Sequence, residues 1–308
     1  MEFSSAVNEL FSVQLREWEL AGTNYSLLTK VRTRKLNPGG FEVLIQYNPE
    51  RIRSSAARVD SKSIEARPCF LCTKNRPEQQ QGLSIENDLT VLVNPFPIFN
   101  KHLTIPSEFH IDQRIVNNLD SMLSLAKALP EFVIFYNGPQ CGASAPDHFH
   151  FQAGNRRFLP LEHDYLTKKF ASAFCGQKGL EIWHWSGYLR GMVTFEGDQS
   201  QKIVEVFDKF YSKFSAVQPD KPEPMLNIIA YYQTGRWIIH IIPRKQHRPS
   251  QFFAEGEKQI LLSPASVDLG GVIITPREED FNKITENDIR NIFAQVCMSD
   301  QEVLKLFL

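Results

Sequence analysis

The sequence predicts an α+β fold whose centre is a mainly antiparallel sheet flanked by helices. Short β-branched and aromatic runs, bounded by turn residues, predict strands along most of the chain. Helical patterns separate these runs at irregular intervals, whereas a parallel sheet would need a regular alternation of strands and helices. The fold class therefore follows from the apolar runs and from the irregular placement of the helices.

The elements can be placed in order along the chain. The expected strands cover 41–47, 89–96, 102–106, 132–138, 148–154, 225–232 and 237–244. Helical periodicity predicts helices over 2–20, 111–129, about 201–215 and 285–307. A four-residue Gln-Thr-Gly-Arg link of hairpin length joins the last two strands, and the proline-rich segment 218–224 is expected to be a connector.

A weak internal similarity between two parts of the sequence suggests that one unit is duplicated. In the first part, a strand ends in Tyr-Asn-Gly and HFHFQ follows; in the second part, a strand ends in Tyr-Tyr, then come a glycine turn and IIHIIPR. Duplication explains both segments, and so does a generic hairpin. If the unit is duplicated, the two halves are 1–165 and 166–308.

Composition and charge narrow the class of protein. The chain has 308 residues, 42% of them hydrophobic, and a formal net charge of −1 from 34 basic and 35 acidic residues. This balance argues against nucleic acid or an anionic membrane as a partner. The N-terminal segment predicts an amphipathic helix instead of a signal peptide, and the apolar runs are too short to span a bilayer. We therefore expect a cytoplasmic protein.

The most informative segment is 136–152, where a loop with glycine, serine and proline leads into an alternating strand. Because side chains alternate along a strand, His148, His150 and Gln152 are expected on one face. A neutral imidazole is a good nucleophile toward phosphorus, and loop N–H groups favour phosphate oxygens. Two half-buried histidines with satisfied hydrogen bonds would give the same string, so the motif by itself leaves both interpretations open.

The cysteines add a second signal. Cys69 and Cys72 have the Cys-x-x-Cys spacing of a zinc knuckle, and His110 and His148 are candidates for the two further ligands of a tetrahedral site. A pair of thiols in an ordinary turn is the alternative. In a reducing compartment, this spacing suggests metal or redox chemistry before a structural disulfide.

These motifs carry a resemblance to a known family. The segment RPCFLCTKNR at 67–76 resembles the zinc knuckle of galactose-1-phosphate uridylyltransferases. The His-x-His-x-Gln strand resembles the active-site motif of the branch of the histidine-triad superfamily in which glutamine replaces the third histidine. HFHFQA is similar to GDP-hexose phosphorylases and, more loosely, to dinucleoside-polyphosphate phosphorylases, and 262–271 is faintly similar to a stretch of the former.

The resemblance implies roles for the motif residues. His150 would be the nucleophile that carries the nucleotidyl group, and Gln152 would hold the phosphoryl oxygen. Cys69, Cys72, His110 and His148 would bind a structural Zn²⁺. The resemblance also implies a histidine-triad-like catalytic half with the zinc knuckle at 1–165, and a degenerate half at 166–308 that contributes to the substrate site.

A wider set of residues is expected to bind substrate. Asn94 would contact the nucleoside. The phosphates would meet the loop and nearby cations, namely Asn137, Gly142, Ser144, Arg51, Arg53 and Arg58, without the sequence deciding among the three arginines. Arg244, in a basic cluster after the last expected strand, is a candidate for an acceptor phosphate through bidentate contacts, or else part of a solvated strand end. Asp147 makes the loop one residue longer than in the uridylyltransferases.

The expected reaction is a two-step transfer through a nucleotidyl-histidine. The donor would be a nucleotide sugar or a dinucleoside polyphosphate. The acceptor would be inorganic phosphate, or a hexose 1-phosphate as in the uridylyltransferases. A non-catalytic nucleotide-binding sensor is the alternative from another class. The chain would act as a monomer, if both halves pair internally, or as a homodimer.

Overall fold

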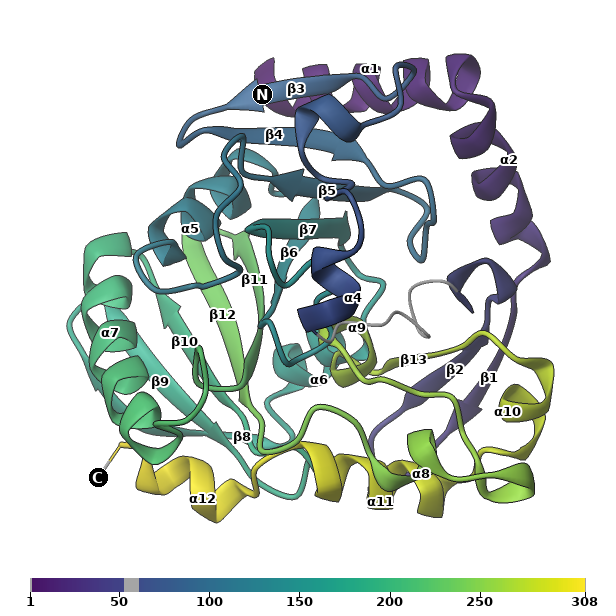
Figure 1. Cartoon of the computed structure of the whole chain (residues 1–308). Helices are drawn as coiled ribbons and strands as arrows, with labels where there is room; N and C mark the ends of the chain where they lie inside the picture. The colour runs from purple at the N-terminus through teal and green to yellow at the C-terminus, as the bar shows by residue number, and fades with distance from the viewer. Residues whose placement is uncertain (1, 53–60, 308) are drawn as a thin grey trace.

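The computed structural model describes residues 2–52 and 61–307. Its centre is a ten-stranded sheet in the order β3-β4-β5-β7-β6-β11-β12-β10-β9-β8, and each neighbouring pair is antiparallel (Figure 1). A smaller sheet has the order β1-β2-β13, with β13 parallel to β2. The predicted α+β class with a large antiparallel sheet is confirmed.

The bounds of the elements follow the chain. The strands are β1 (Arg32–Leu36), β2 (Val43–Tyr47), β3 (Gly82–Ile85), β4 (Leu89–Val93), β5 (His102–Pro106), β6 (Phe132–Asn137), β7 (His150–Asn155), β8 (Ala171–Gln177), β9 (Leu180–Trp185), β10 (Val193–Gly197), β11 (Leu226–Gln233), β12 (Arg236–Pro243) and β13 (Val272–Thr275). The helices are α1 (Glu2–Glu17), α2 (Glu19–Leu27), α4 (Ser61–Glu65), α5 (Leu119–Ala128), α6 (Pro160–Thr167), α7 (Ser200–Val217), α8 (Ser250–Phe253), α9 (Ser266–Leu269), α10 (Glu278–Lys283), α11 (Glu286–Val296) and α12 (Asp300–Lys305).

The strand order repeats when the large sheet is read inward from its two edges. The sequence β3-β4-β5, helix α5, and β6-β7 on one side corresponds to β8-β9-β10, helix α7, and β11-β12 on the other. In the first half, β7 lies between β5 and β6. In the second half, β12 lies between β10 and β11. The halves join where β6 pairs with β11, from Asn137↔Asn227 to Ile134↔Ala230. This order is the pattern expected of two similar halves in tandem.

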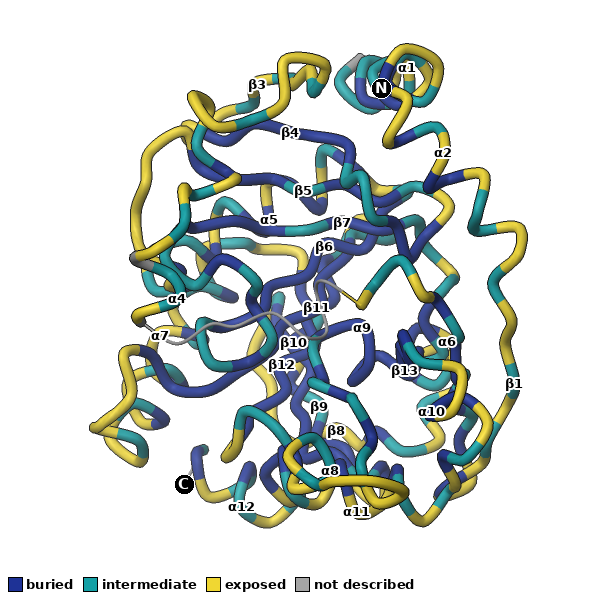
Figure 2. Tube along the Cα trace, turned by 45° about the vertical axis from the view of Figure 1, so that its right-hand side comes forward, coloured by how far each residue is buried: buried dark blue, intermediate teal, exposed yellow. Residues whose placement is uncertain are grey.

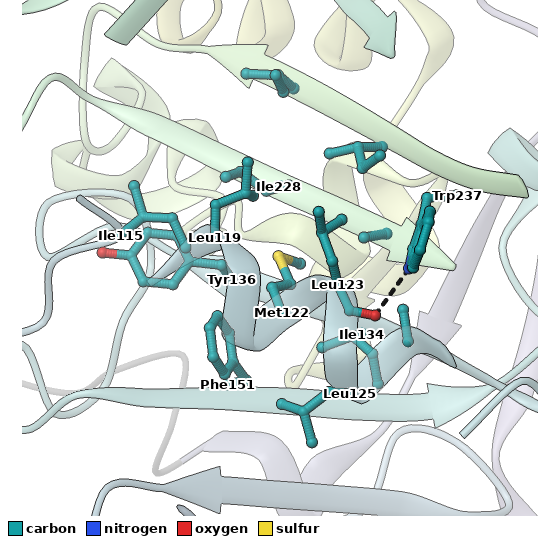
Figure 3. Packing of buried hydrophobic residues seen from close by; sticks show 14 of the residues in the cluster. Ile115, Leu119, Met122, Leu123, Leu125, Ile134, Tyr136, Phe151, Ile228 and Trp237 are labelled. Atoms are coloured by element: carbon teal, nitrogen blue, oxygen red, sulfur yellow. Dashed lines mark hydrogen bonds between the residues drawn. The ribbon is translucent and has the colours of Figure 1, made fainter. Parts of the chain in front are cut away.

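Apolar side chains cover both faces of the large sheet. The tube coloured by burial shows buried residues along its central strands (Figure 2). One face packs against α1, α5, α7 and α12; there, the indole N–H of Trp237 donates to the carbonyl of Leu123, 2.8 Å away (Figure 3). The other face packs against α6, α11 and the smaller sheet. Within the described ranges, no helix combines the length and the hydropathy needed to cross a bilayer.

Several predicted boundaries are corrected. The first helix is interrupted at Trp18, which has an extended backbone between α1 and α2. The segment 111–118 is not helical because its backbone serves the loop beside β7: the N–H of Gln113 donates to Pro146, and that of Ile115 donates to Glu223. The strand predicted from 148 begins at His150. The strands β1, β3, β8, β9, β10 and β13 were not predicted.

Candidate active site and metal centre

A pocket of about 430 Å³ lies on the face of the large sheet that looks toward the smaller sheet. Its floor comes from β5, β6 and β7, through Thr104, Asn137, His150 and Gln152. Its walls come from distant parts of the chain: the α1–α2 junction, the segments around 51, 67–80 and 92–98, and the segment 262–268. Residues far apart in sequence therefore enclose the motif that the sequence singled out.

His150 is held with one ring nitrogen engaged and the other free. Its side chain is 3% exposed and lines the pocket. Its Nδ1 lies 2.8 Å from the carbonyl oxygen of His148, which can only accept, so Nδ1 carries the proton. The lone pair is then on Nε2, which has no hydrogen-bond partner among the described residues. Burial lowers the pKa of His150 to about 4, so the ring is neutral at neutral pH.

The start of β7 is fixed by Gln113, a residue that the sequence analysis missed. The side-chain oxygen of Gln113 accepts from the backbone N–H of His150 at 2.7 Å. Its side-chain NH₂ group donates to the backbone carbonyls of His150 and Asn137 at 3.0 Å. Gln113 thus ties together the ends of β6 and β7, where both strands enter the pocket. No periodic pattern marked Gln113, because its function depends on an irregular segment.

The loop that follows β6 carries the expected phosphate-binding positions to the pocket. Asn137, Gly142 and Ser144 all line it. The Oδ1 of Asn137 accepts from the N–H and the hydroxyl of Ser266 and from the amide of Asn227, which leaves the Asn137 NH₂ group as a donor. Gly142 has a φ of +95°, and a Cβ there would lie 2.6 Å from the Cβ of Ala265. Glycine is therefore required both by the backbone and by the wall opposite.

Four side chains beside the pocket form a compact set of metal ligands. One ligand atom from each of Cys69, Cys72, His110 and His148 lies within 4.8 Å of the others. The sulfur of Cys69 is 3.3 Å from Nδ1 of His148, and the sulfur of Cys72 is 3.2 Å from Nδ1 of His110. With zinc bonds of about 2.3 Å to sulfur and 2.0 to 2.1 Å to nitrogen, tetrahedral geometry separates a sulfur and a nitrogen ligand by about 3.5 Å. The two distances are slightly shorter than this value, and the 3.6 Å between the sulfur of Cys72 and Nδ1 of His148 is close to it.

A hydrogen bond beside this set orients the imidazole of His148 for a metal. The Nε2–H of His148 donates to the carbonyl of Ser107 at 2.8 Å, which turns Nδ1 toward the thiols. A carboxylate oxygen of Asp147 lies 3.6 Å from Nε2 of His110, which is near the ring but beyond hydrogen-bond distance. Although burial opposes ionisation, the hydrogen bond with His148 lowers the pKa of Cys69 to about 6. Two thiols and two imidazoles suit a structural zinc ion with no open position.

Comparisons with known proteins cover both halves of the chain. A model described as "Domain of unknown function (DUF4922)" matches residues 10–155, and one described as "GDPGP1-like, C-terminal domain" matches residues 161–306. Galactose-1-phosphate uridylyltransferase of Halalkalibacterium halodurans is 24% identical over 200 residues, which are 58% of this chain and 38% of that protein. The uridylyltransferase of Clostridium perfringens is 24% identical over 184 residues, 53% of this chain and 34% of that protein.

Solved structures resemble the whole fold. Yeast Ap4A phosphorylase Apa2 in complex with Ap4A has a TM-score of 0.64 and 13% identity, and covers 97% of this chain and 98% of its own. Its complex with AMP has a TM-score of 0.59 and 16% identity, and covers 90% of this chain and 94% of its own. The chain spans little more than a third of the uridylyltransferases, and at these identities the likeness to the yeast enzyme concerns the fold.

The two family models and the two uridylyltransferases support the resemblance to the uridylyltransferase and nucleotide-phosphorylase branch of the histidine-triad superfamily. The motif of this branch, with glutamine in place of the third histidine, stands at the floor of the pocket on His150 and Gln152.

The three arginines expected to meet the phosphates fall in two different situations. Arg51 lines the pocket, and its Nη1 donates to the carbonyl of Phe96 at 2.7 Å. Burial lowers the pKa of Arg51 to about 10, against the opposing charge of Asp268, so the guanidinium stays charged at neutral pH. Arg53 and Arg58 lie outside the described residues.

The position of Arg244 does not fit the expected phosphate contact. Its side chain is fully buried away from the pocket lining. Its guanidinium donates to Asn227 and to the carbonyls of Pro264, Gln246 and His247 at 2.7 to 3.0 Å. We correct the expectation: Arg244 holds the segment behind the pocket wall, because both of its terminal guanidinium nitrogens, Nη1 and Nη2, donate to protein oxygens.

Arg67 and Asn94 also line the pocket, and their side chains bond to other residues of its walls. Arg67, which the sequence analysis quoted but did not assign, lines the pocket and donates to the carbonyl of Ser144 at 2.7 Å. Asn94 lines the pocket as expected, but its amide donates to Thr104 and its Oδ1 accepts from the N–H of Phe96. Asn94 therefore shapes this wall while both ends of its carboxamide are engaged.

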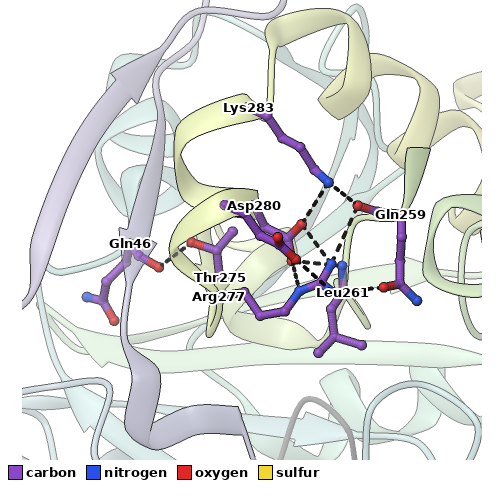
Figure 4. Close-up of polar contacts among 8 residues, drawn as sticks. Gln46, Gln259, Leu261, Thr275, Arg277, Asp280 and Lys283 are labelled. Carbon is purple, nitrogen blue, oxygen red and sulfur yellow. Dashed lines mark hydrogen bonds and ion pairs between the residues drawn. The ribbon is translucent and has the colours of Figure 1, made fainter. Parts of the chain in front are cut away.

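The wall at 262–268 is anchored from behind. Asp280, which is fully buried, accepts from the N–H of Leu261 at 3.0 Å and from Nε of Arg277 at 2.7 Å, while Lys283 donates to the carbonyl of Gln259 (Figure 4). This network fixes the chain just before it reaches the pocket. In the sequence analysis this segment showed only a faint resemblance, because its place in the site depends on contacts across the fold.

Proposed function

We propose that the protein is a nucleotidyltransferase or phosphorylase that works through a nucleotidyl-His150 intermediate. The observation that carries the proposal is the free lone pair on Nε2 of His150, which is held at the pocket floor by the bond from Nδ1 to His148. A nucleophile with a fixed tautomer in a pocket lined by amides and arginines suits attack on a phosphate.

The reaction has two displacements. In the first, Nε2 of His150 attacks the α-phosphorus of a nucleotide sugar or a dinucleoside polyphosphate. The N–P bond forms, and the P–O bond to the departing phosphate breaks with its electron pair on that oxygen. In the second, an oxygen of inorganic phosphate or of a hexose 1-phosphate attacks the same phosphorus, and the N–P bond breaks. His150 is then neutral again, and the nucleotidyl group has moved to the acceptor.

The pocket residues stabilise the charge that moves in these steps. The NH₂ groups of Asn137 and Gln152 and the guanidinium of Arg51 offer donors and positive charge to the phosphoryl oxygens. Zinc at Cys69, Cys72, His110 and His148 would hold the loop that precedes His150 and would take no part in bond making. The thiols must remain reduced to bind it, which agrees with a cytoplasmic location.

The domain organisation is part of this proposal. The half at 1–165 supplies the nucleophile and the metal site, and the half at 166–308 supplies the wall at 262–268 and the residues that orient Asn137. Because β6 and β11 pair the halves within one chain, we propose a monomer as the working unit. Sedimentation of the purified protein distinguishes it from a homodimer.

The test is intact-protein mass spectrometry after brief incubation with nucleotide sugars and dinucleoside polyphosphates, without acceptor. We expect an acid-labile adduct on the wild-type protein and none on His150→Ala, and its mass identifies the nucleotide. Addition of inorganic phosphate or of hexose 1-phosphate to the adduct then shows which acceptor discharges it. An adduct on His150→Ala would overturn the mechanism. Binding of these nucleotides without any adduct would favour a non-catalytic sensor.

A further inference from the structure

The orientation of the Gln152 carboxamide decides what this side chain can do. A carboxamide has an oxygen that accepts hydrogen bonds and an NH₂ group that donates them. Only the NH₂ group can bind a phosphoryl oxygen, whereas the carbonyl oxygen would repel it. Something behind Gln152 must therefore hold its oxygen away from the pocket.

His102 lies at that position. It is the first residue of β5, and Gln152 is its diagonal neighbour on β7, where Gln152 pairs with Thr104. The Nε2 of His102 is 3.0 Å from Oε1 of Gln152. His102 does not line the pocket itself, so it stands behind Gln152 as seen from the substrate.

A backbone N–H settles the tautomer of His102. The N–H of Ile98 lies 3.2 Å from Nδ1 of His102 and can only donate, so Nδ1 accepts. The proton of the neutral ring is then on Nε2, which donates to Gln152. The Oε1 of Gln152 accepts this bond, and its NH₂ group, which has no partner among the described residues, is left for the pocket.

The imidazole of His102 is itself rigidly held. It is fully buried, in edge contact with the ring of Phe99 and tilted against that of Phe135. The backbone of His102 is bonded to the hydroxyl of Tyr25, which accepts from the backbone N–H at 3.1 Å and donates to the backbone carbonyl at 3.0 Å. Burial and, next, the charge of Arg51 lower the pKa of His102 to about 3, so its protonation state is constant across the physiological range.

We propose that His102 is a positioning residue that turns the Gln152 amide so that its NH₂ group faces the transferred phosphoryl group. The relay runs from the N–H of Ile98 through His102 to Gln152, and each member fixes the direction of the next. This inference rests on the proposed function in one respect, namely that a phosphoryl group is what the NH₂ group meets.

Two substitutions separate the donor from the bulk of the ring. In His102→Gln, the side-chain nitrogen can replace Nε2 as the donor to Gln152. In His102→Asn, the shorter amide can still accept from Ile98 but does not reach Gln152. We expect His102→Asn to slow adduct formation about ten- to hundred-fold, because a donor to the transition state loses its orientation. His102→Gln should recover most of the rate.

His240 provides a matched control in the other half. It is also fully buried on the same face of the large sheet, with burial lowering its pKa to about 3, and its Nδ1 bonds to the hydroxyl of Thr194 at 2.7 Å. It does not line the pocket. His240→Asn should lower stability as much as His102→Asn does, with no change in the rate of adduct formation. Equal loss of rate in both variants would mean that His102 is merely structural.

A double-mutant cycle and a measurement without substrate complete the test. In a Gln152→Ala background, His102→Asn should cause no further loss of rate, and an additive loss would overturn the proposal. Nitrogen-15 NMR of the histidine-labelled protein reports the tautomer whether or not any donor is turned over. A proton on Nε2 of His102 is the expected result, and a proton on Nδ1 would refute the relay. A wild-type protein that forms no adduct would refute the proposed function and leave the relay to the NMR result.

Discussion

At the scale of single residues, the backbone and buried polar groups determine which atoms of the site are free to react. The carbonyl of His148 selects the tautomer of His150, and the N–H of Ile98 selects that of His102. Neither choice needs a charged side chain, and burial keeps both rings neutral by lowering the pKa of each. We therefore expect pH to act on the site through buried groups that bond to the segments around it, and not through His150 or His102.

Glu223 is such a group, and its titration gives the first prediction. Its carboxyl is buried, accepts from Tyr136 and from the N–H of Ile115, and joins the 218–224 connector to the loop beside β7. Burial raises the pKa of Glu223 from 4.5 to about 7. Because the folded state prefers the protonated acid, this group's contribution to stability is complete below pH 4.5 and is lost as the pH rises through 7.

The variant Glu223→Gln should not show this loss. Relative to wild type, its free energy of unfolding should increase by about 2 to 3 kcal/mol between pH 4.5 and pH 8, since one pKa unit corresponds to about 1.4 kcal/mol. Urea unfolding of both proteins at a series of pH values measures the difference, in which the titrations of all other groups cancel. A difference that stays constant with pH would contradict the raised pKa.

At the scale of elements, the knuckle at 67–76 and the start of β7 form one unit. Cys69 and Cys72 meet His148, whose carbonyl in turn holds His150. Under the proposed function, a metal bound to Cys69, Cys72 and His148 would also hold His150, through the hydrogen bond from its Nδ1 to the carbonyl of His148. Its loss should change both the local stability and the reaction, although the metal touches no reacting atom.

Cys69→Ser gives the second prediction. We expect the zinc content to fall from about one ion per chain to none, and the melting temperature to fall by about 5 °C or more, because metal binding contributes directly to folding. Elemental analysis and thermal unfolding measure the two effects. Cys175→Ser, at an exposed thiol on β8, is the matched control and should change neither. Zinc retained by Cys69→Ser would remove Cys69 from the ligand set.

The same scale shows how far the sequence predicts the fold and the site. The buried strands β4 to β7, β11 and β12 have strong apolar runs, and all were predicted. The strands β1 and β8 were missed because they are largely exposed at sheet edges, where no alternation of apolar residues is required. The strand β13 is only four residues long, and its pairing with β2 is a long-range contact that local pattern cannot show.

The site follows the same division. The motif residues and the four metal ligands are local signals, and the structure brings them together. Arg67, Gln113, His102 and Asp268 were not assigned, because the importance of each depends on a neighbour distant in sequence. Arg244 was assigned incorrectly for the converse reason: a basic cluster predicts a phosphate contact, while the fold buries its guanidinium among carbonyls.

At the scale of the whole molecule, the two halves share one sheet and both cores. The core beside α5 and α7 contains Phe151 from the first half and Phe195 from the second, and the opposite core contains Ile45 and Ile238. A break at the β6–β11 pairing would expose a long strand edge and apolar surface on both faces of the sheet. Such exposure is costly, since burial of apolar area contributes about 25 cal/mol per Å².

The third prediction is that neither half forms the site alone. We expect a single cooperative transition for the intact chain by calorimetry, and a fragment of residues 1–165 without a native thermal transition. The pocket needs the wall at 262–268, and Asn137 needs Ser266 and Asn227 to direct its amide, so the fragment should also form no nucleotidyl adduct. Addition of a 166–308 fragment should restore both the transition and the adduct if the halves reassemble through β6 and β11. A 1–165 fragment that melts cooperatively and accepts a nucleotide would show instead that the second half is dispensable, and that Asn137 is oriented from within its own half.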